Sequence, residues 1–302
     1  MALAGVSNVY STSNDLLKAF LGIDLSVSQV CRVTHLLGEQ LSTELLQEVD
    51  HPPLAEDELI YGSIDGSMLL TDEGWQEVKP GRIFASQSRV EAGKKGDRET
   101  RFRLTESTYS GHLGTHSDFT PLFEASLGAY KTKPEQLVFI TDGAVWIEQY
   151  LQQTYPKATY IVDYYHAAEH LTEFVRIHFK GTRAGGQWFD NQKEILLTDG
   201  VDSVLSALSS LTGLSDGAVH CRQMLAGYFG RNRHRMRYGH FRHRGLQIGS
   251  GPIEAAHRTV IQTRMKRSAQ RWTDAGAQAM LNLRVVAKSG RWHLVRKNLN
   301  EA

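Results

Sequence analysis

The sequence is poor in cysteine and proline and has no long apolar run. Of its 302 residues, 2 are Cys and 7 are Pro. Two thiols, Cys31 and Cys221, form at most one disulfide and cannot build a four-thiolate zinc site, so we expect structural cysteines. No apolar stretch approaches the roughly 20 residues that cross a bilayer, and residues 1–25 lack the pattern of a secretory signal. These absences predict a soluble, cytoplasmic globular protein without membrane contact.

The charge is unevenly distributed, although the formal net charge is only +1. Residues 1–221 carry 17 Lys and Arg against 30 Asp and Glu, whereas residues 222–297 carry 17 against 2. A basic carboxyl-terminal third of this kind predicts a polyanionic partner such as DNA. The alternative is a basic face that docks on the acidic part of the same chain.

The hydrophobic periodicity predicts an α/β protein. Residues 14–49 predict two short helices, the second capped by Ser26, which suggest packing or a helix-turn-helix remnant. Three strands in meander order follow, and then alternating helices and strands, which together predict a mixed sheet with helices on both faces. The expected strands are 59–71, 75–84, 101–109, 136–141 and 158–164, and the expected helices are 117–130, 144–155 and 166–179. We expect four segments: 1–55, 56–181, 182–245 and 246–302.

Residues 182–245 contain no strand-like run and predict a helical insertion, with helices over 188–197, 201–211 and 218–229. In the last segment, Ser250 and Pro252 have the residue types of a helix start, and apolar residues follow at helical spacing. A final helix is expected over 274–287.

Three acidic residues stand out as candidate ligands of a metal ion. Asp65 interrupts an apolar strand, where a carboxylate needs a counter-charge or hydrogen-bond donors. Asp142 ends a buried strand, a favoured place for catalytic acids and also a common place for turns. Glu254 lies in the first turn of a helix, where an acid also stabilises the dipole, and it is one of two acids in the basic third.

Carboxylate oxygens suit Mg²⁺ or Mn²⁺, which bridge to phosphate oxygens. Two such ions about 3.5–4 Å apart activate the attacking group and stabilise the leaving oxygen in a displacement at phosphorus. Asp65, Asp142 and Glu254 therefore predict metal-dependent phosphodiester chemistry on DNA.

Four motifs in this order resemble DDE transposases of bacterial insertion sequences, with the greatest likeness to the Kra-type group and its Mutator-like relatives. They are Ile64-Asp65-Gly66, Ile140-Thr141-Asp142-Gly143-Ala144-Val145-Trp146-Ile147, Asp163-Tyr164-Tyr165-His166 and Gly249-Ser250-Gly251-Pro252-Ile253-Glu254. The likeness covers residues 55–290.

The resemblance implies an RNase H-like core, in which a mixed five-stranded sheet is flanked by helices and an all-helical insertion precedes the last catalytic helix. It also implies a metal-binding catalytic triad of Asp65, Asp142 and Glu254. The family's reaction is hydrolysis at the transposon end, followed by attack of the exposed 3′-hydroxyl on target DNA. Asp163 and His166 match a signature near the active site, where a packed core histidine is the alternative. A homodimer on double-stranded DNA is expected from the family, because transposition joins two ends.

Basic side chains in the last third are the expected DNA contacts, and His234, His240 and His243 add charge at low pH. The expected contacts are Arg231, Arg233, Arg235, Arg237, Arg242, Arg244, Arg258, Arg264, Lys266, Arg267 and Arg271.

Two other functions are compatible with parts of the sequence. Only about 55 residues precede the core, so a truncated or inactive transposase-derived DNA-binding protein is the main alternative. The segment His166-Ala167-Ala168-Glu169-His170 also fits the H-x-x-E-H pattern of inverted zinc metalloproteases. That pattern leaves Asp65, Asp142 and the charge distribution unexplained.

Overall fold

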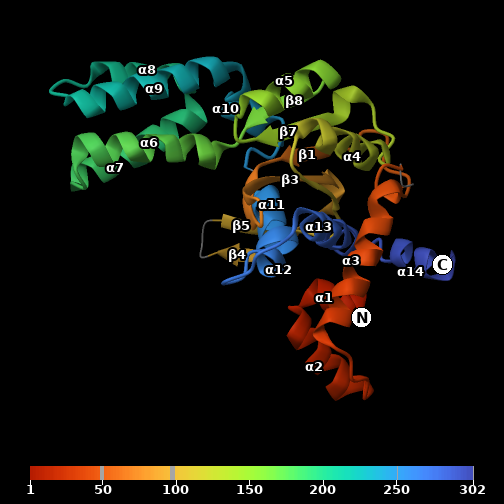
Figure 1. Cartoon of the computed structure of the whole chain (residues 1–302). Coiled ribbons are helices and arrows are strands. Elements are labelled where there is room, and N and C mark those ends of the chain that lie inside the picture. Colours follow the sequence, from red (N-terminus) through yellow and green to blue (C-terminus); the bar gives the residue numbers. More distant parts are fainter. Residues whose placement is uncertain (48–50, 96–98, 250, 302) are drawn as a thin grey trace. The chain divides into compact units, whose positions relative to one another are not determined.

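The computed structural model describes residues 1–47, 51–95, 99–249 and 251–301 (Figure 1). The chain divides into two compact units: Met1–Leu137 together with Gly251–Ala302, and Val138–Ser250. Strands are antiparallel in the first unit and parallel in the second, so the protein is α/β with both strand orientations, as predicted. In the described part, no helix is both long enough and apolar enough to span a membrane.

The first unit is built on an antiparallel sheet. Its strands are β1 (Ile60–Ile64), β2 (Ser67–Thr71), β3 (Gly74–Ala85) and β6 (Thr108–Leu113). Strands β1 and β2 both pair with β3 on one side, and β6 pairs with it on the other. A separate hairpin, β4 (Arg89–Lys95) with β5 (Glu99–Leu104), leaves the sheet between β3 and β6. The predicted third strand, 101–109, is therefore wrong in its bounds, because it joins the end of β5 to the start of β6.

Two helices cover opposite faces of this sheet. Gly81 on β3 faces Phe119 and Phe123 of α4 (His116–Gly128), whereas Gly111 on β6 faces Leu281 of α13 (Asp274–Lys288). Gly81 pairs with Ser110, the neighbour of Gly111, and successive residues of a strand point to opposite faces. Glycine at both positions lets the helices approach, because an added Cβ atom would come within 3.1 Å of side-chain carbon atoms.

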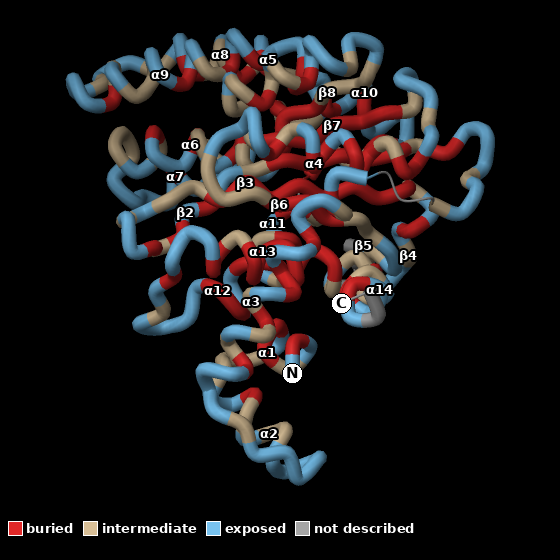
Figure 2. The backbone as a smooth tube through the Cα atoms, turned by 45° about the vertical axis from the view of Figure 1, so that its right-hand side comes forward, coloured by how far each residue is buried: buried red, intermediate tan, exposed pale blue. Residues whose placement is uncertain are grey.

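The amino-terminal helices belong to the same unit. They are α1 (Ala2–Ser7), α2 (Tyr10–Leu21) and α3 (Val27–Glu44), and α3 packs along α13. Ser26 caps α3 as predicted, in a capping box with Gln29. Most of α2 is exposed, as Figure 2 shows, with Ser13 its only buried residue.

The remaining helices of the first unit are α11 (Gly251–Ala256), α12 (Thr263–Met265) and α14 (His293–Glu301). A π-helical turn, His257–Gln262, connects α11 and α12. Helix α11 packs against β3 and β1. Ser250, the predicted cap, lies outside the described residues.

The second unit contains a parallel strand pair and a group of helices. Strands β7 (Leu137–Thr141) and β8 (Thr159–Val162) are parallel and are followed by α5 (Val145–Thr154) and α6 (Tyr164–Phe179) respectively. The predicted helical insertion contains α7 (Arg183–Thr198), α8 (Val201–Ser210), α9 (Asp216–Asn232), a 3-10 turn Arg233–Arg235 and α10 (Tyr238–His243). Helices α6 to α9 pack on one another.

Candidate functional site

Asp65 lies at an interruption of a long strand rather than inside it. Ile64 pairs with Gly81 and Ser67 pairs with Val78, so β1 and β2 keep one register on both sides of the interruption. In this register Pro80 stands opposite Asp65, and proline has no N–H to donate to the ladder. The Asp65 amide still donates to the Pro80 carbonyl at 3.2 Å.

The Asp65 side chain is 31% exposed, which corrects the prediction of a buried carboxylate. Its Oδ1 accepts a 2.6 Å hydrogen bond from the Gly66 amide. The broken ladder therefore presents a partly solvated carboxylate at the sheet.

Glu254 lies on α11, and its side chain is exposed. The start of α11 is held by the buried Arg82 of β3, whose Nη1 donates to the Pro252 carbonyl oxygen at 2.5 Å. On the inner face of the helix, Ile253 and Ala256 are buried in the core of this unit. The helix thus lies on the strands that carry Asp65.

His257 is in direct contact with Asp65. Its Nε2 lies 3.0 Å from Asp65 Oδ2, and the His257 side chain is 12% exposed. His257 follows Glu254 by three residues, a spacing that places side chains on the same side of a helix. His257 was not among the residues predicted from the sequence, although its spacing from Glu254 was a usable signal.

Asp142 follows the last residue of β7, as predicted. Its Oδ1 accepts a hydrogen bond from the Ala144 amide at 2.9 Å, and its carbonyl oxygen accepts one from the Tyr228 hydroxyl at 3.0 Å. Gly143 between them has φ +91°, a conformation that favours glycine. Burial, and secondarily the Asp142 charge, raises the pKa of Tyr228, so this hydroxyl stays protonated and donates.

Asp163 directly follows the last residue of β8, as Asp142 directly follows the last residue of β7. Thr141 and Val162 are register partners at the ends of β7 and β8, so Asp142 and Asp163 follow at the same edge of the parallel pair. Asp163 is 1% exposed and caps α6 by accepting a 2.9 Å hydrogen bond from the His166 amide. The observed contact of this signature pair is therefore a helix cap.

His166 and His170 on α6 make an edge-to-face ring contact, close in sequence to Asp163. Their ring centroids are 4.9 Å apart, and the His170 ring lies 4.0 Å from that of Tyr228. Burial, with a smaller contribution from His166, lowers the pKa of His170. Glu169 is exposed. His170 thus packs against Tyr228 of α9, and His166 packs against His170.

The predicted triad is divided between the two units: Asp65 and Glu254 belong to the first and Asp142 to the second. Across the described ranges, no three His, Cys, Asp or Glu side chains stand together as a ready metal site. Asp65 nevertheless fits a cation, because its carboxylate is partly solvated and the nearby His257 Nε2 is buried without a hydrogen bond.

The eleven predicted DNA contacts separate into two groups. Nine are exposed: Arg231, Arg233, Arg237, Arg242, Arg244, Arg258, Lys266, Arg267 and Arg271. Arg235 and Arg264 are 2% and 0% exposed, so their assignment as DNA contacts is wrong. Arg235 pairs with Glu148. Arg264 donates to the Gly5 carbonyl oxygen and lies over the Tyr10 and Trp272 rings.

The segment 266–272 runs beside β2. Lys266 Nζ donates to Ser67 Oγ at 2.6 Å, and Arg271 Nε donates to the Thr71 carbonyl oxygen at 3.3 Å. Thr71 and Trp272 also form a parallel β-bridge. These contacts hold exposed positive charge next to the strand that follows Asp65.

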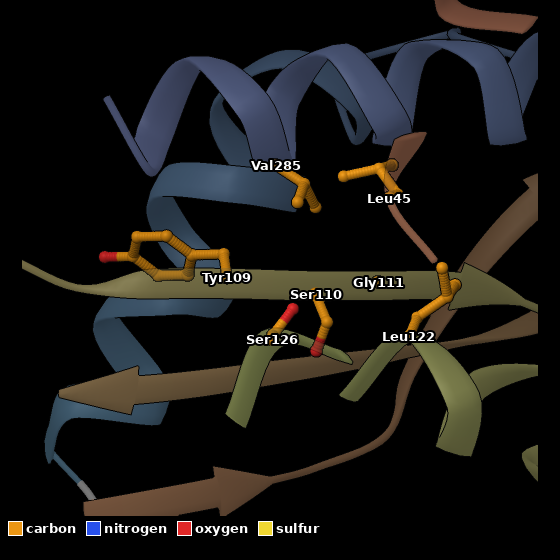
Figure 3. Close-up of a pocket in the computed structure, with 7 residues that line it drawn as sticks. All are labelled: Leu45, Tyr109, Ser110, Gly111, Leu122, Ser126 and Val285. Carbon is orange, nitrogen blue, oxygen red and sulfur yellow. The ribbon is translucent and has the colours of Figure 1, made fainter. Parts of the chain in front are cut away.

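A small crevice in the first unit contributes no ligand site. As Figure 3 shows, Tyr109, Ser110 and Gly111 of β6 form its floor, and Leu45, Leu122, Ser126 and Val285 complete its lining. It is too narrow to admit a water molecule, so we interpret it as a packing gap between β6 and its covering helices.

No protein-family model matches this chain, and no match to it was found among curated proteins.

Proposed function

We propose that this protein is a DDE-type transposase that cleaves DNA and transfers strands with the help of divalent metal ions. The observation that carries the proposal is the meeting of Asp65 with the helix of Glu254. The 3.0 Å contact between Asp65 Oδ2 and His257 Nε2 brings the motif of Asp65 close to the motif of Glu254, although the two motifs are far apart in the sequence. Packing of α11 on β1 and β3 supports the same placement.

The position of Asp142 supports the proposal independently. It follows a parallel strand at the edge where α/β sheets bind ligands. The Tyr228 hydroxyl donates to the Asp142 carbonyl oxygen, and the Ala144 amide donates to the Asp142 carboxylate. These two hydrogen bonds fix both the backbone and the side chain of Asp142. The order of elements is also compatible with an RNase H-like core: four antiparallel sheet strands, with the β4–β5 hairpin inserted before the last of them, are followed by helix, strand, helix, strand and helix.

Asp65, Asp142 and Glu254 would hold Mg²⁺ or Mn²⁺, in our proposal two ions, through hard carboxylate oxygens. Bound there, the ions supply Lewis-acid stabilisation of charge at the reacting phosphate and at the attacking and leaving oxygens. The chain itself positions the carboxylates: the Gly66 amide orients Asp65, and Arg82 anchors the helix of Glu254.

Double-stranded DNA is the proposed substrate and partner. The exposed Lys266, Arg267 and Arg271 lie along or near β2, which begins two residues after Asp65. Cations in this position attract phosphates to the acidic site and hold the backbone in register. We further propose that the protein acts as a homodimer on DNA, because transposition joins two transposon ends. We propose the cytoplasm as its location.

The test is strand cleavage by the purified 302-residue chain. Supercoiled plasmid is incubated with Mg²⁺ or Mn²⁺, and nicked, linear and joined products are separated on a gel. We expect Asp65→Asn, Asp142→Asn and Glu254→Gln to abolish the products. Asp24→Asn, which changes an exposed acid whose carboxylate pairs with Lys18, is the matched control and should cleave like the wild type.

Equal cleavage by the wild type and Asp142→Asn would refute the assigned chemistry. Salt-dependent DNA binding without metal-dependent cleavage in any variant would instead support the inactive DNA-binding protein. Proteolysis lost on Glu169→Gln would favour the metalloprotease alternative.

A further inference from the structure

We propose that His257 is a ligand of the divalent cation at Asp65, so that this site prefers Mn²⁺ over Mg²⁺. The inference rests on the proposed function for the assignment of Asp65 as a metal ligand. It adds a nitrogen donor to a site that the sequence describes with oxygen donors alone.

The distance between the two donor atoms suits a shared cation. Ligands at right angles around an octahedral ion, each about 2.1 Å from it, are about 3.0 Å apart. His257 Nε2 and Asp65 Oδ2 are 3.0 Å apart in the structure. Their relative orientation is not that of a hydrogen bond, because Nε2 has no hydrogen-bond partner by distance and angle.

The environment of Nε2 supports a ligand role. The atom is buried, and a buried polar atom without a partner carries a cost of about 1–3 kcal/mol. A cation between the imidazole and the carboxylate removes this cost, because both donor atoms then have a partner. It also uses the charge of Asp65, whose side chain remains open to solvent on one side.

The chain holds His257 rigidly in place. It is the first residue of the π-helical turn His257–Gln262, a feature frequent at functional sites. Val260 and Ile261 of this turn are buried in the core. The guanidinium of the buried Arg284 donates to the carbonyl oxygens of Val260 and Thr259. The imidazole therefore approaches Asp65 from a fixed backbone.

The donor set decides the metal. Imidazole nitrogen binds first-row transition cations well, whereas Mg²⁺ strongly prefers oxygen donors. Mn²⁺ accepts both donor types and also suits phosphodiester chemistry. A site with one imidazole and one carboxylate from this unit thus favours Mn²⁺ over Mg²⁺, and Glu254, three residues before His257, offers a further carboxylate on the same side of the helix.

The competing explanation is a simple ion pair between a protonated His257 and Asp65. The two explanations predict opposite effects of removing the imidazole. If His257 is a ligand, its removal weakens Mn²⁺ binding. If it only neutralises Asp65, its removal leaves the carboxylate more available, and Mn²⁺ binding stays the same or tightens.

The experiment measures metal binding to the full chain without DNA. Pulsed electron paramagnetic resonance of bound Mn²⁺ detects a directly coordinated ¹⁴N nucleus, and calorimetry gives the dissociation constants of Mn²⁺ and Mg²⁺. We expect nitrogen coupling in the wild type, its loss in His257→Gln and its retention in His220→Gln, which changes an exposed histidine of the second unit. The Mn²⁺ dissociation constant should rise about tenfold or more in His257→Gln, and that of Mg²⁺ by less than about threefold.

Circular dichroism of each variant verifies folding, and His257→Asn is a second variant with a shorter side chain. Absence of nitrogen coupling in the wild type overturns the proposal without reference to any variant. So does coupling that persists in His257→Gln, or unchanged or tighter Mn²⁺ binding in that variant.

The outcome is separable from that of the cleavage test. Nitrogen coupling at His257 without plasmid cleavage would leave the metal site intact and remove the transposase proposal. Cleavage that depends on Asp65 and Asp142, without nitrogen coupling, would support the transposase proposal and overturn the assignment of His257 as a metal ligand.

Discussion

Nη2 of Arg235 lies 2.6 Å from Oε2 of Glu148 and forms an ion pair whose arginine side chain is 3% exposed. Arg235 ends the 3-10 turn after α9, and Glu148 lies in the first turn of α5. Because α5 begins three residues after Asp142, the pair ties the helical insertion to the turn that carries this candidate ligand. Within the second unit, the insertion therefore supports Asp142 structurally.

Replacing Arg235 with Ala should destabilise the protein substantially. The change leaves the partly buried Glu148 without its closest cation, and breaking such a pair costs about 3 kcal/mol. Urea unfolding measures the loss. Arg233→Ala is the control: its pair with Asp202 is exposed on both sides, and such pairs contribute below about 1 kcal/mol. Similar losses for both variants would contradict the structural role of Arg235.

DNA affinity should depend on exposed arginines. Arg237→Ala removes an exposed cation and is expected to weaken DNA binding across all sequences. If Arg237 contacts a phosphate, the slope of log affinity against log salt becomes shallower by about 0.9. Fluorescence anisotropy at several salt concentrations measures both quantities. An unchanged slope would remove Arg237 from the DNA-binding surface.

Gly38→Ala should separate two packed helices. A Cβ atom at Gly38 would lie 2.1 Å from the carbonyl oxygen of Ala279, so α3 and α13 must move apart. We expect a loss of about 1–3 kcal/mol in the free energy of unfolding, typical of a core steric clash. The matched substitution Gly186→Ala meets nothing within 4 Å and lies inside α7.

In the control Gly186→Ala, replacing glycine in a helix should stabilise by about 0.5–1 kcal/mol. Thermal unfolding compares the two variants directly. Equal stability of Gly38→Ala and the wild type would show that α3 does not pack closely on α13.

Stability should fall as the pH drops below about 6.5, the ordinary pKa of histidine. Burial lowers the pKa of His35, outweighing the opposite effect of Glu39, so the folded state favours the neutral ring. The unfolded chain takes up the proton first, and stability is lost between about pH 6.5 and the lower pKa of the folded state. Above this window, the contribution of His35 is constant.

His35→Gln should make the free energy of unfolding less dependent on pH between 7.5 and 5.5. Denaturant titrations at both values measure the difference. His112 and His170 have pKa values lowered by burial as well, so part of the slope should remain in the variant. An unchanged slope would mean that His35 is solvated in the folded protein.

Local signals in the sequence predicted much of the fold. The Ser26 cap, the insertion helices α7 to α9 and helix α13 were found because caps and hydrophobic periodicity depend on residues a few positions apart. The run 59–71 was predicted as one strand with Asp65 inside it, whereas the structure divides it into β1 and β2; Asp142 was correctly placed at the end of β7. These features need no information from distant parts of the chain.

Pairing across the chain was not predictable in the same way. The hairpin of β4 and β5 was not predicted. A single strand was predicted over 101–109, across the end of β5 and the start of β6, because charged or polar residues alternate with others there. Which segment joins β3 depends on the fit of Gly111 against Leu281, residues from distant segments.

Local composition and spacing were enough to predict an α/β protein, its helical insertion, and the three acidic motifs with a basic last third. The contact of His257 with Asp65, and the burial of Arg235 and Arg264, follow from how distant segments pack in the folded chain. The physical reason is that the cost and partners of a charge depend on which distant segment covers it. Hydrophobic periodicity indicates which face of a helix is apolar, but it does not indicate which distant residues will contact a charged side chain of that helix.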